Sequence, residues 1–135
     1  MLGVERKLRL GTLSARRDWG FAGDYVRAMH LMLAREDPED FVVGTGMTHS
    51  VEELVARAFA VAGLDWREHV VCDAAYVRPA EVDHLCADPS KAAKELGWEP
   101  TVGFDELVTM MVESDLALLS GPGAHEDDSF GPEAW

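Results

Sequence analysis

The chain has only two clear apolar runs of the kind that form buried strands, Phe41–Val43 and Val70–Cys72. Strands of a parallel sheet are buried on both faces and need neighbours on both edges. Two or three short strands therefore cannot build such a sheet by themselves. Helical patterns occupy much of the remaining sequence. We expect an α/β chain that is rich in helices and has an incomplete sheet.

Two of the expected helices have clear start and stop signals. Residues 50–62 begin at Ser50, and Glu53 follows three positions later, which is a capping box. Gly63 lies where such a helix commonly ends. A shorter helix, 90–96, follows Asp88-Pro89, with the carboxylate as N-cap and the proline at the first helical position. Gly97 ends it.

Two further helices, 21–35 and 104–119, are predicted from apolar stripes. The second stripe is expected to face inward. The stripes comprise Tyr25, Val26, Met29, Met32 and Leu33 in the first helix, and Phe104, Leu107, Val108, Met111 and Val112 in the second. Residues 120–135 contain turn formers and acids without periodicity, which predicts a disordered acidic tail.

Composition narrows the partners of the chain. A net charge of −13 over 135 residues argues against nucleic acid and anionic membranes, because phosphate backbones bind basic surfaces. No apolar run approaches the roughly 18 residues that cross a bilayer, and the first residues lack the apolar core of a signal peptide. We expect a cytoplasmic protein in which Cys72 and Cys86 are reduced, buried, small hydrophobic residues.

Two arginines lie in short, turn-prone segments that could bind phosphate. Arg17 precedes Asp-Trp-Gly, and Arg78 precedes Pro-Ala-Glu81. A guanidinium presents a planar fork of donors that matches phosphate oxygens, and proline restricts the preceding arginine to extended conformations. Structural alternatives stay open for each: Arg17 could pair with Asp18 or Asp24, and Glu81 could pair with Arg78.

Other chemistry is weakly indicated. His69, Cys72, His84 and Cys86 are permitted zinc ligands, but buried thiols and surface histidines explain them better, so we expect no metal site. The sequence has no Gly-x-Gly-x-x-Gly after a strand and no Tyr-x-x-x-Lys pair. We therefore expect neither catalytic nor cofactor-binding residues in this chain.

Three stretches carry a family resemblance: RRDWGFAGDYVRAMHLML, FVVGTGMTHSVEEL and YVRPAEVDHLCADPSKAAKELGWEP. They are similar to the C-terminal part of the GDP-mannose 4,6-dehydratases, which are extended short-chain dehydrogenase/reductases. The resemblance implies that residues 1–119 are the C-terminal, sugar-nucleotide-binding portion of a Rossmann-type fold. The family's NADP-binding glycines and catalytic Tyr and Lys have no counterpart here, so NADP is expected in the full-length enzyme and not on this chain alone.

The same resemblance implies roles for three residues. Arg17 and Arg78 would contact the diphosphate, and Glu81 would accept hydrogen bonds from the guanosine ribose hydroxyls. The segment Gly11-Thr12-Leu13-Ser14-Ala15 departs from the family's Gly-Asn-Leu-Asp-Ala at two positions.

The expected function is that of the GDP-mannose-binding part of a dehydratase, inactive alone. The expected partners are an N-terminal half or homologous subunits. The alternatives are a non-catalytic GDP-sugar-binding module and an interaction or assembly remnant.

Overall fold

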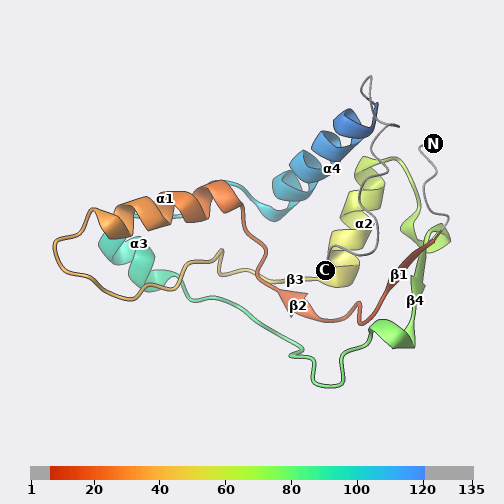
Figure 1. Ribbon diagram of the computed structural model, residues 1–135, viewed down its shortest axis with the longest axis horizontal. Helices are drawn as coiled ribbons and strands as arrows, with labels where there is room; N and C mark the ends of the chain where they lie inside the picture. The colour runs from red at the N-terminus through yellow and green to blue at the C-terminus, as the bar shows by residue number, and fades with distance from the viewer. Residues whose placement is uncertain (1–6, 121–135) are drawn as a thin grey trace, which may run out of the picture.

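The computed structural model describes residues 7–120, which form an elongated arrangement with two groups of helices (Figure 1). Helices α1 and α3 lie together at one end, and α2 and α4 lie together at the other. Short strands connect and flank these groups. The helices are α1 (Ala22–Leu33), α2 (Val51–Val61), α3 (Ser90–Leu96) and α4 (Phe104–Ser120), with short 3-10 turns at η1 (Trp66–Glu68) and η2 (Ala74–Tyr76).

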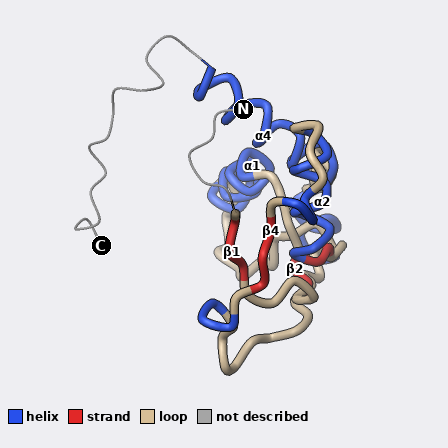
Figure 2. The backbone as a smooth tube through the Cα atoms, turned by 90° about the vertical axis from the view of Figure 1, so that its right-hand side faces the viewer, coloured by secondary structure: helices blue, strands red, loops and turns tan. Residues whose placement is uncertain are grey.

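The strands form two separate pairs. Strand β1 (Leu8–Leu10) runs parallel to β4 (Val70–Cys72), side by side in Figure 2. Strand β2 (Arg16–Arg17) runs antiparallel to β3 (His49–Ser50). In the described part of the chain each sheet has only two strands. The predicted helix-rich α/β chain with an incomplete sheet is therefore confirmed.

The predicted helix boundaries follow the capping signals. The Ser50 hydroxyl accepts a hydrogen bond from the Glu53 amide, and the Glu53 carboxylate accepts one from the Ser50 amide, which completes the capping box. Gly63 and Gly97 adopt positive φ angles of 72° and 61° just after α2 and α3. Glycine populates this region at little cost, so it ends both helices. The prediction of Asp88 as the N-cap of α3 is wrong by one position: Pro89 stands at the N-cap, and the Asp88 carboxylate before it accepts a hydrogen bond from the Ser90 amide at 3.0 Å.

The prediction of a strand at Phe41–Val43 is wrong. This segment has no strand hydrogen bonds to the other described residues, and Val42 is 56% exposed. A strand exists only where a neighbouring strand supplies donors and acceptors. The Phe41 ring instead packs below the charged groups of Arg35 and Lys91, which lie 5.4 and 4.6 Å from its centroid.

A small core joins α1 to α3. Ala28, Ala92 and Trp98 are almost completely buried there, and the Trp98 indole donates to the backbone oxygen of Asp24 at 2.8 Å. A buried indole N–H requires an acceptor, and the Asp24 carbonyl supplies it, so Trp98 can be buried just after the end of α3. Partly buried side chains complete this core: Tyr25, Leu31, Met32, Phe41, Val43 and Leu96.

Several apolar side chains remain exposed. In α1, Val26, Met29 and Leu33 are 62%, 59% and 86% exposed. Met111 of α4 is 52% exposed, so its predicted inward orientation is wrong, because α4 packs on α2 through the face that buries Val108. Of the predicted tail, only Ser120 belongs to the described residues, where it ends α4.

The two cysteines are also exposed, contrary to prediction. Cys72 lies on a strand with one neighbour, and Cys86 lies in the extended segment before α3. Neither position has a second layer of structure over it within the described range. Between residues 7 and 120 no three acidic, histidine or cysteine side chains gather as a metal site would require. None of the helices in that range is long and apolar enough to cross a membrane.

Candidate functional site

The site predicted from the sequence is built around β2. The backbone of Arg16 pairs with Ser50 of β3 on one side and with the 83–85 segment on the other. The Arg16 amide donates to the Asp83 carbonyl at 2.8 Å, and the Leu85 amide donates to the Arg16 carbonyl at 3.1 Å. The loop that follows η2 is thereby held beside the strand that carries Arg17 (Figure 1).

This arrangement brings Arg17 and Glu81 together across 64 positions of sequence. The Arg17 Nη2 donates to Glu81 Oε1, and its Nη1 donates to the Arg16 carbonyl at 2.7 Å. Both side chains are largely sheltered, with 25% and 22% of their surface exposed. The alternative pairings are not found: Glu81 does not pair with Arg78, and Asp24 pairs with Arg27 at 3.2 Å.

Arg78 lies earlier on the same loop and is exposed. Its guanidinium makes no hydrogen bond or ion pair with residues 7–120. The approach to Arg78 is fixed by a close contact, since a Cβ on Gly11 would come within 2.3 Å of the Tyr76 carbonyl oxygen. The Asp73 carboxylate caps η2 through the Ala75 amide and also accepts a hydrogen bond from Arg9 at 3.0 Å. Arg78 is thus presented to solvent from a well-anchored turn.

The Asp18 carboxylate joins three segments next to this loop. It accepts hydrogen bonds from the amides of Thr45, Gly46 and Ala87 and from the Thr45 hydroxyl, at 2.6–3.2 Å. Burial raises the pKa of Asp18, but these four hydrogen bonds outweigh it and hold the pKa below its ordinary value. Asp18 is therefore a charged acceptor at physiological pH.

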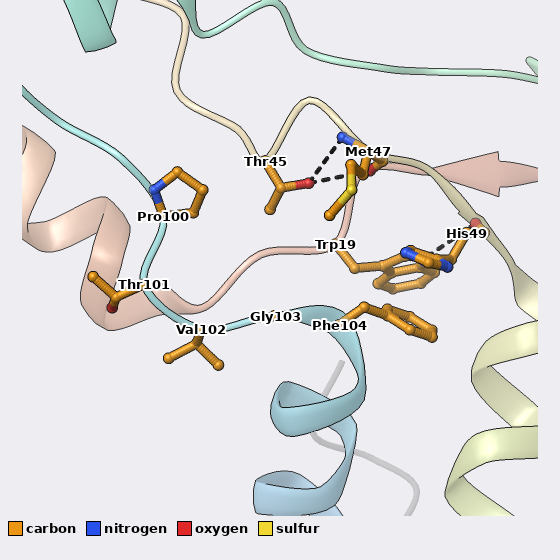
Figure 3. A pocket seen from close by; sticks show the side chains of 9 residues that line it. All are labelled: Trp19, Thr45, Met47, His49, Pro100, Thr101, Val102, Gly103 and Phe104. Carbon is orange, nitrogen blue, oxygen red and sulfur yellow. Dashed lines mark hydrogen bonds between the residues drawn. The ribbon is translucent and has the colours of Figure 1, made fainter.

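A cavity of about 130 Å³ lies nearby, and the sequence did not predict it (Figure 3). The rings of His49 and Phe104 stack at 3.8 Å between centroids, and the Trp19 indole donates to the His49 carbonyl at 3.2 Å. The other walls of the cavity come from two turns, one before β3 and one before α4: Thr45, Met47, Pro100, Thr101, Val102 and Gly103. Neither Arg17, Arg78 nor Glu81 lines it. The only sequence signal for it was the aromatic residue of the Arg-Asp-Trp motif.

The arrangement around β2 has a definite chemical capacity. One guanidinium is open to an anion, and a second is bound to a carboxylate that keeps one oxygen, Oε2, outside that pair. Guanidinium groups suit phosphate, and a carboxylate oxygen suits hydroxyl donors. The residues around β2 therefore include one group suited to a phosphate and one suited to a hydroxyl donor.

Solved structures share this fold. A structure of MoeE5 in complex with UDP-glucose and NAD aligns with a TM-score of 0.74 at 26% identity, over 84% of this chain and 38% of that one. The UDP-glucose 4-epimerase of Thermotoga maritima with UDP-glucose aligns with a TM-score of 0.73 at 29% identity, over 84% and 36%. The chain thus has the architecture of part of a Rossmann-type short-chain dehydrogenase/reductase, as the sequence predicted.

Sequence relatives define the branch. The family model described as GDP-mannose 4,6 dehydratase matches residues 1–111. GDP-mannose 4,6 dehydratase 1 of Arabidopsis thaliana is 54% identical over 117 residues, which cover 87% of this chain and 32% of the relative. The human GDP-mannose 4,6 dehydratase is 44% identical over 135 residues, with 87% and 36% covered. The chain belongs to the GDP-mannose 4,6-dehydratase family and spans about a third of the length of these curated relatives.

Proposed function

We propose that this chain is the sugar-nucleotide-binding portion of a GDP-mannose 4,6-dehydratase. The parent reaction converts GDP-mannose to GDP-4-dehydro-6-deoxymannose and water with NADP as the cofactor. The family match supports the parent activity. The arrangement around β2 supports the binding role, because it groups the residue types that a nucleoside diphosphate requires.

The observation that carries this proposal is the ion pair between Arg17 of β2 and Glu81, because Glu81 lies on the same loop as the exposed Arg78. In the proposed complex, Arg78 binds the diphosphate, and Oε2 of Glu81 accepts from a ribose hydroxyl. Arg17 already donates to Glu81 and to a backbone carbonyl. Its main contribution is therefore to orient the carboxylate and to add positive charge near the phosphates.

Electrostatics make the unpaired arginine important. The whole chain carries a net charge of −13, which repels an anionic ligand at long range. Charges farther away than a Debye length, about 10 Å at 0.1 M salt, are largely screened, so the nearby exposed Arg78 counts for more than distant acids. GDP affinity should therefore fall as salt rises, because the contact between Arg78 and phosphate is screened.

The chemical steps are assigned to residues that this chain does not carry. In the family, a tyrosine acts as the base while C4 of mannose passes a hydride to NADP; water is then lost across C5–C6, and the hydride returns to C6. Tyr25 and Tyr76 are followed four positions later by Met29 and Ala80, so neither belongs to a Tyr-x-x-x-Lys pair. We propose that the chain alone binds no NADP and does not turn over GDP-mannose.

The proposal is tested by calorimetric titration of the 135-residue chain with GDP, GMP and guanosine. We expect saturable GDP binding, weaker GMP binding and the weakest guanosine binding, because Arg78 recognises phosphate. Equal affinities for all three would contradict the diphosphate assignment. In parallel, incubation with GDP-mannose and NADP should yield no 4-keto product by mass spectrometry, and turnover above the enzyme-free control would contradict the inactivity.

Two alternatives predict different results. A non-catalytic GDP-sugar-binding module would also bind GDP, but it would fold alone as a stable monomer. An assembly remnant is favoured by the exposed apolar side chains of α1. It would self-associate without binding GDP.

A further inference from the structure

We propose that Asp18 is a positioning residue that holds the loop bearing Arg78 and Glu81 in its ligand-binding conformation. The inference rests on the proposed function for the identity of the ligand. It assigns to Asp18 no contact with the ligand itself. Asp18 acts instead through the segment that joins η2 to α3.

The hydrogen bonds of Asp18 locate this role. Oδ1 accepts from the Thr45 amide at 2.8 Å and from the Thr45 hydroxyl at 2.6 Å. Oδ2 accepts from the Gly46 amide at 2.9 Å and from the Ala87 amide at 3.2 Å. We call residues 77–87, which follow η2 and carry Arg78 and Glu81, the 77–87 loop. The Asp18 carboxylate therefore ties the end of β2 to the turn before β3 and to the end of this loop.

Packing at this junction is close. A Cβ on Gly44 would come within 2.3 Å of the Ala87 Cβ and 3.0 Å of Asp18 Oδ2. Gly44 is buried, so the turn, the loop and the carboxylate meet without space for another atom. Such a junction fixes the position of Ala87 rather than merely satisfying its amide.

Asp18 and Arg17 hold different parts of the loop. Arg17 binds Glu81, whereas Asp18 binds Ala87 at the loop's C-terminal end. Between these points, the loop backbone pairs with Arg16 through Asp83 and Leu85. The hydrogen bonds of Asp18 go to Thr45, Gly46 and Ala87, so it acts on the loop separately from the Arg17–Glu81 pair.

This geometry predicts energetic coupling between the junction and the ligand. Residues 74–80 and 82–86 are all exposed, so the loop is ordered by few contacts: the anchored η2 turn at its start, these hydrogen bonds, and one between Thr48 Oγ1 and His84 Nε2 at 3.1 Å. A ligand that binds Arg78 and Glu81 orders the same loop. The Asp18 hydrogen bonds should therefore strengthen ligand binding, and a bound ligand should strengthen the Asp18 hydrogen bonds, since such coupling is reciprocal. GDP should protect the Ala87 and Leu85 amides, although neither is assigned to the ligand.

The chain offers a matched control in Asp24. Its carboxylate accepts hydrogen bonds from the Thr101 amide, the Thr101 hydroxyl and the Val102 amide at 2.7–3.2 Å. These bonds resemble those of Asp18, but they join α1 to the segment before α4. None of them reaches the 77–87 loop. Asp24→Asn therefore reports the general cost of losing a multiply bonded carboxylate.

The experiment is amide hydrogen exchange with calorimetry on the full 135-residue chain, comparing wild type, Asp18→Asn and Asp24→Asn. Without ligand, Asp18→Asn should speed exchange at Leu85 about tenfold, because an amide group cannot accept all four hydrogen bonds. Asp24→Asn should leave Leu85 unchanged. GDP should slow exchange at Ala87 in wild type, and Asp18→Asn should weaken GDP binding about tenfold. Thr45→Val, which removes one of the four bonds, should give smaller shifts in the same directions if Asp18→Asn fails to fold.

Unchanged exchange at Leu85 in Asp18→Asn, or in Thr45→Val where that variant replaces it, would overturn the inference. Equal losses of GDP affinity in Asp18→Asn and Asp24→Asn would also overturn it, since the effect would then be general destabilisation. Absence of GDP binding by wild type would contradict the proposed function instead. The ligand-free comparison at Leu85 would still decide whether Asp18 positions the loop.

Discussion

At the scale of single residues, partners decide what each charged side chain can do. The sequence points to Arg17 and Arg78 through their turn-prone segments and the proline after Arg78, and to Glu81 through the family resemblance. Which arginine would pair with Glu81 could not be predicted, because it depends on how the 77–87 loop returns beside β2. The structure leaves Arg78 exposed and Arg17 paired, so the two arginines should not contribute equally to binding.

Arg78→Ala should weaken GDP binding more than Arg17→Ala. A charge-assisted hydrogen bond contributes roughly 1.5–3 kcal/mol, so loss of the phosphate contact should cost at least about tenfold in affinity. Arg17 already donates to Glu81 and a backbone carbonyl, so its loss acts indirectly. Calorimetry checks the order. Arg67→Ala, in η1 before β4, controls for removal of one positive charge. Equal or reversed losses would show that Arg78 is not the main phosphate anchor.

The hydrogen bonds between Asp24 and residues 101–102 form a junction between α1 and the segment before α4. The stability of this junction should depend on pH. Burial raises the pKa of Asp24, but hydrogen bonds from Thr101 and Val102 and the charge of Arg27 lower it below the ordinary value overall. A lowered folded-state pKa stabilises the junction above the unfolded value of about 3.9, and that stability is lost as pH falls through the folded value. Asp24→Asn should therefore reduce protection of the Thr101 amide at neutral pH and flatten its decline in acid.

The measurement for Asp24 is amide exchange at Thr101, corrected for the intrinsic rate at each pH. Loss of charge on a buried, multiply bonded acceptor should lower the local opening free energy by about 1–3 kcal/mol at neutral pH. The Ala62 amide, which donates to the Ala58 carbonyl, is the internal reference, because neither group titrates. A variant with wild-type protection at Thr101 would contradict the assignment.

At the scale of elements, local signals were reliable and long-range ones were not. The capping box of α2 and the glycines after α2 and α3 act within one turn of chain, and their predicted boundaries are confirmed. The strand expected at Phe41–Val43 needs a neighbour from elsewhere in sequence, and none lies beside it in the described residues. Burial of Trp98 likewise depends on an acceptor 74 positions away.

Ser50→Ala should destabilise the first turn of α2. It removes the hydroxyl that accepts from the Glu53 amide, a loss typically of about 1 kcal/mol. Exchange at Glu53 should then become about fivefold faster, because each 1.4 kcal/mol changes an equilibrium tenfold. Ser14→Ala, at an exposed position outside the helices, is the matched control. Equal effects of the two changes would indicate that the capping box contributes nothing.

At the scale of the whole molecule, apolar surface exceeds what the core can cover. Six apolar residues are buried among those described, whereas seventeen large ones are exposed, so much of the hydrophobic content does not stabilise this fold. Val26, Met29 and Leu33 lie on one face of α1, at a helical spacing that usually marks a buried face. Exposed apolar patches of several hundred Å² are uncommon on soluble monomers.

The chain alone should therefore bind ANS and self-associate, while its helices persist through their local caps. Each 100 Å² of uncovered apolar surface forfeits about 2.5 kcal/mol of potential stabilisation, against total stabilities of about 5–15 kcal/mol. Sedimentation measures the self-association, and ANS fluorescence measures the exposed apolar surface. The paired variants Val26→Gln and Met29→Gln should reduce both signals, whereas Glu52→Gln on exposed α2 surface should not. A monomer with a cooperative melt would favour an autonomous binding module.

Complementation tests the central claim most directly. The chain is co-expressed with the N-terminal part of a homologous dehydratase, which supplies the glycine loop and the Tyr-x-x-x-Lys pair. The product of GDP-mannose is then followed by mass spectrometry. We predict a stable complex that forms the 4-keto sugar nucleotide, no product from either part alone, and a marked loss of turnover with Arg78→Ala. A stable complex that makes no product, or product from the chain by itself, would contradict the account.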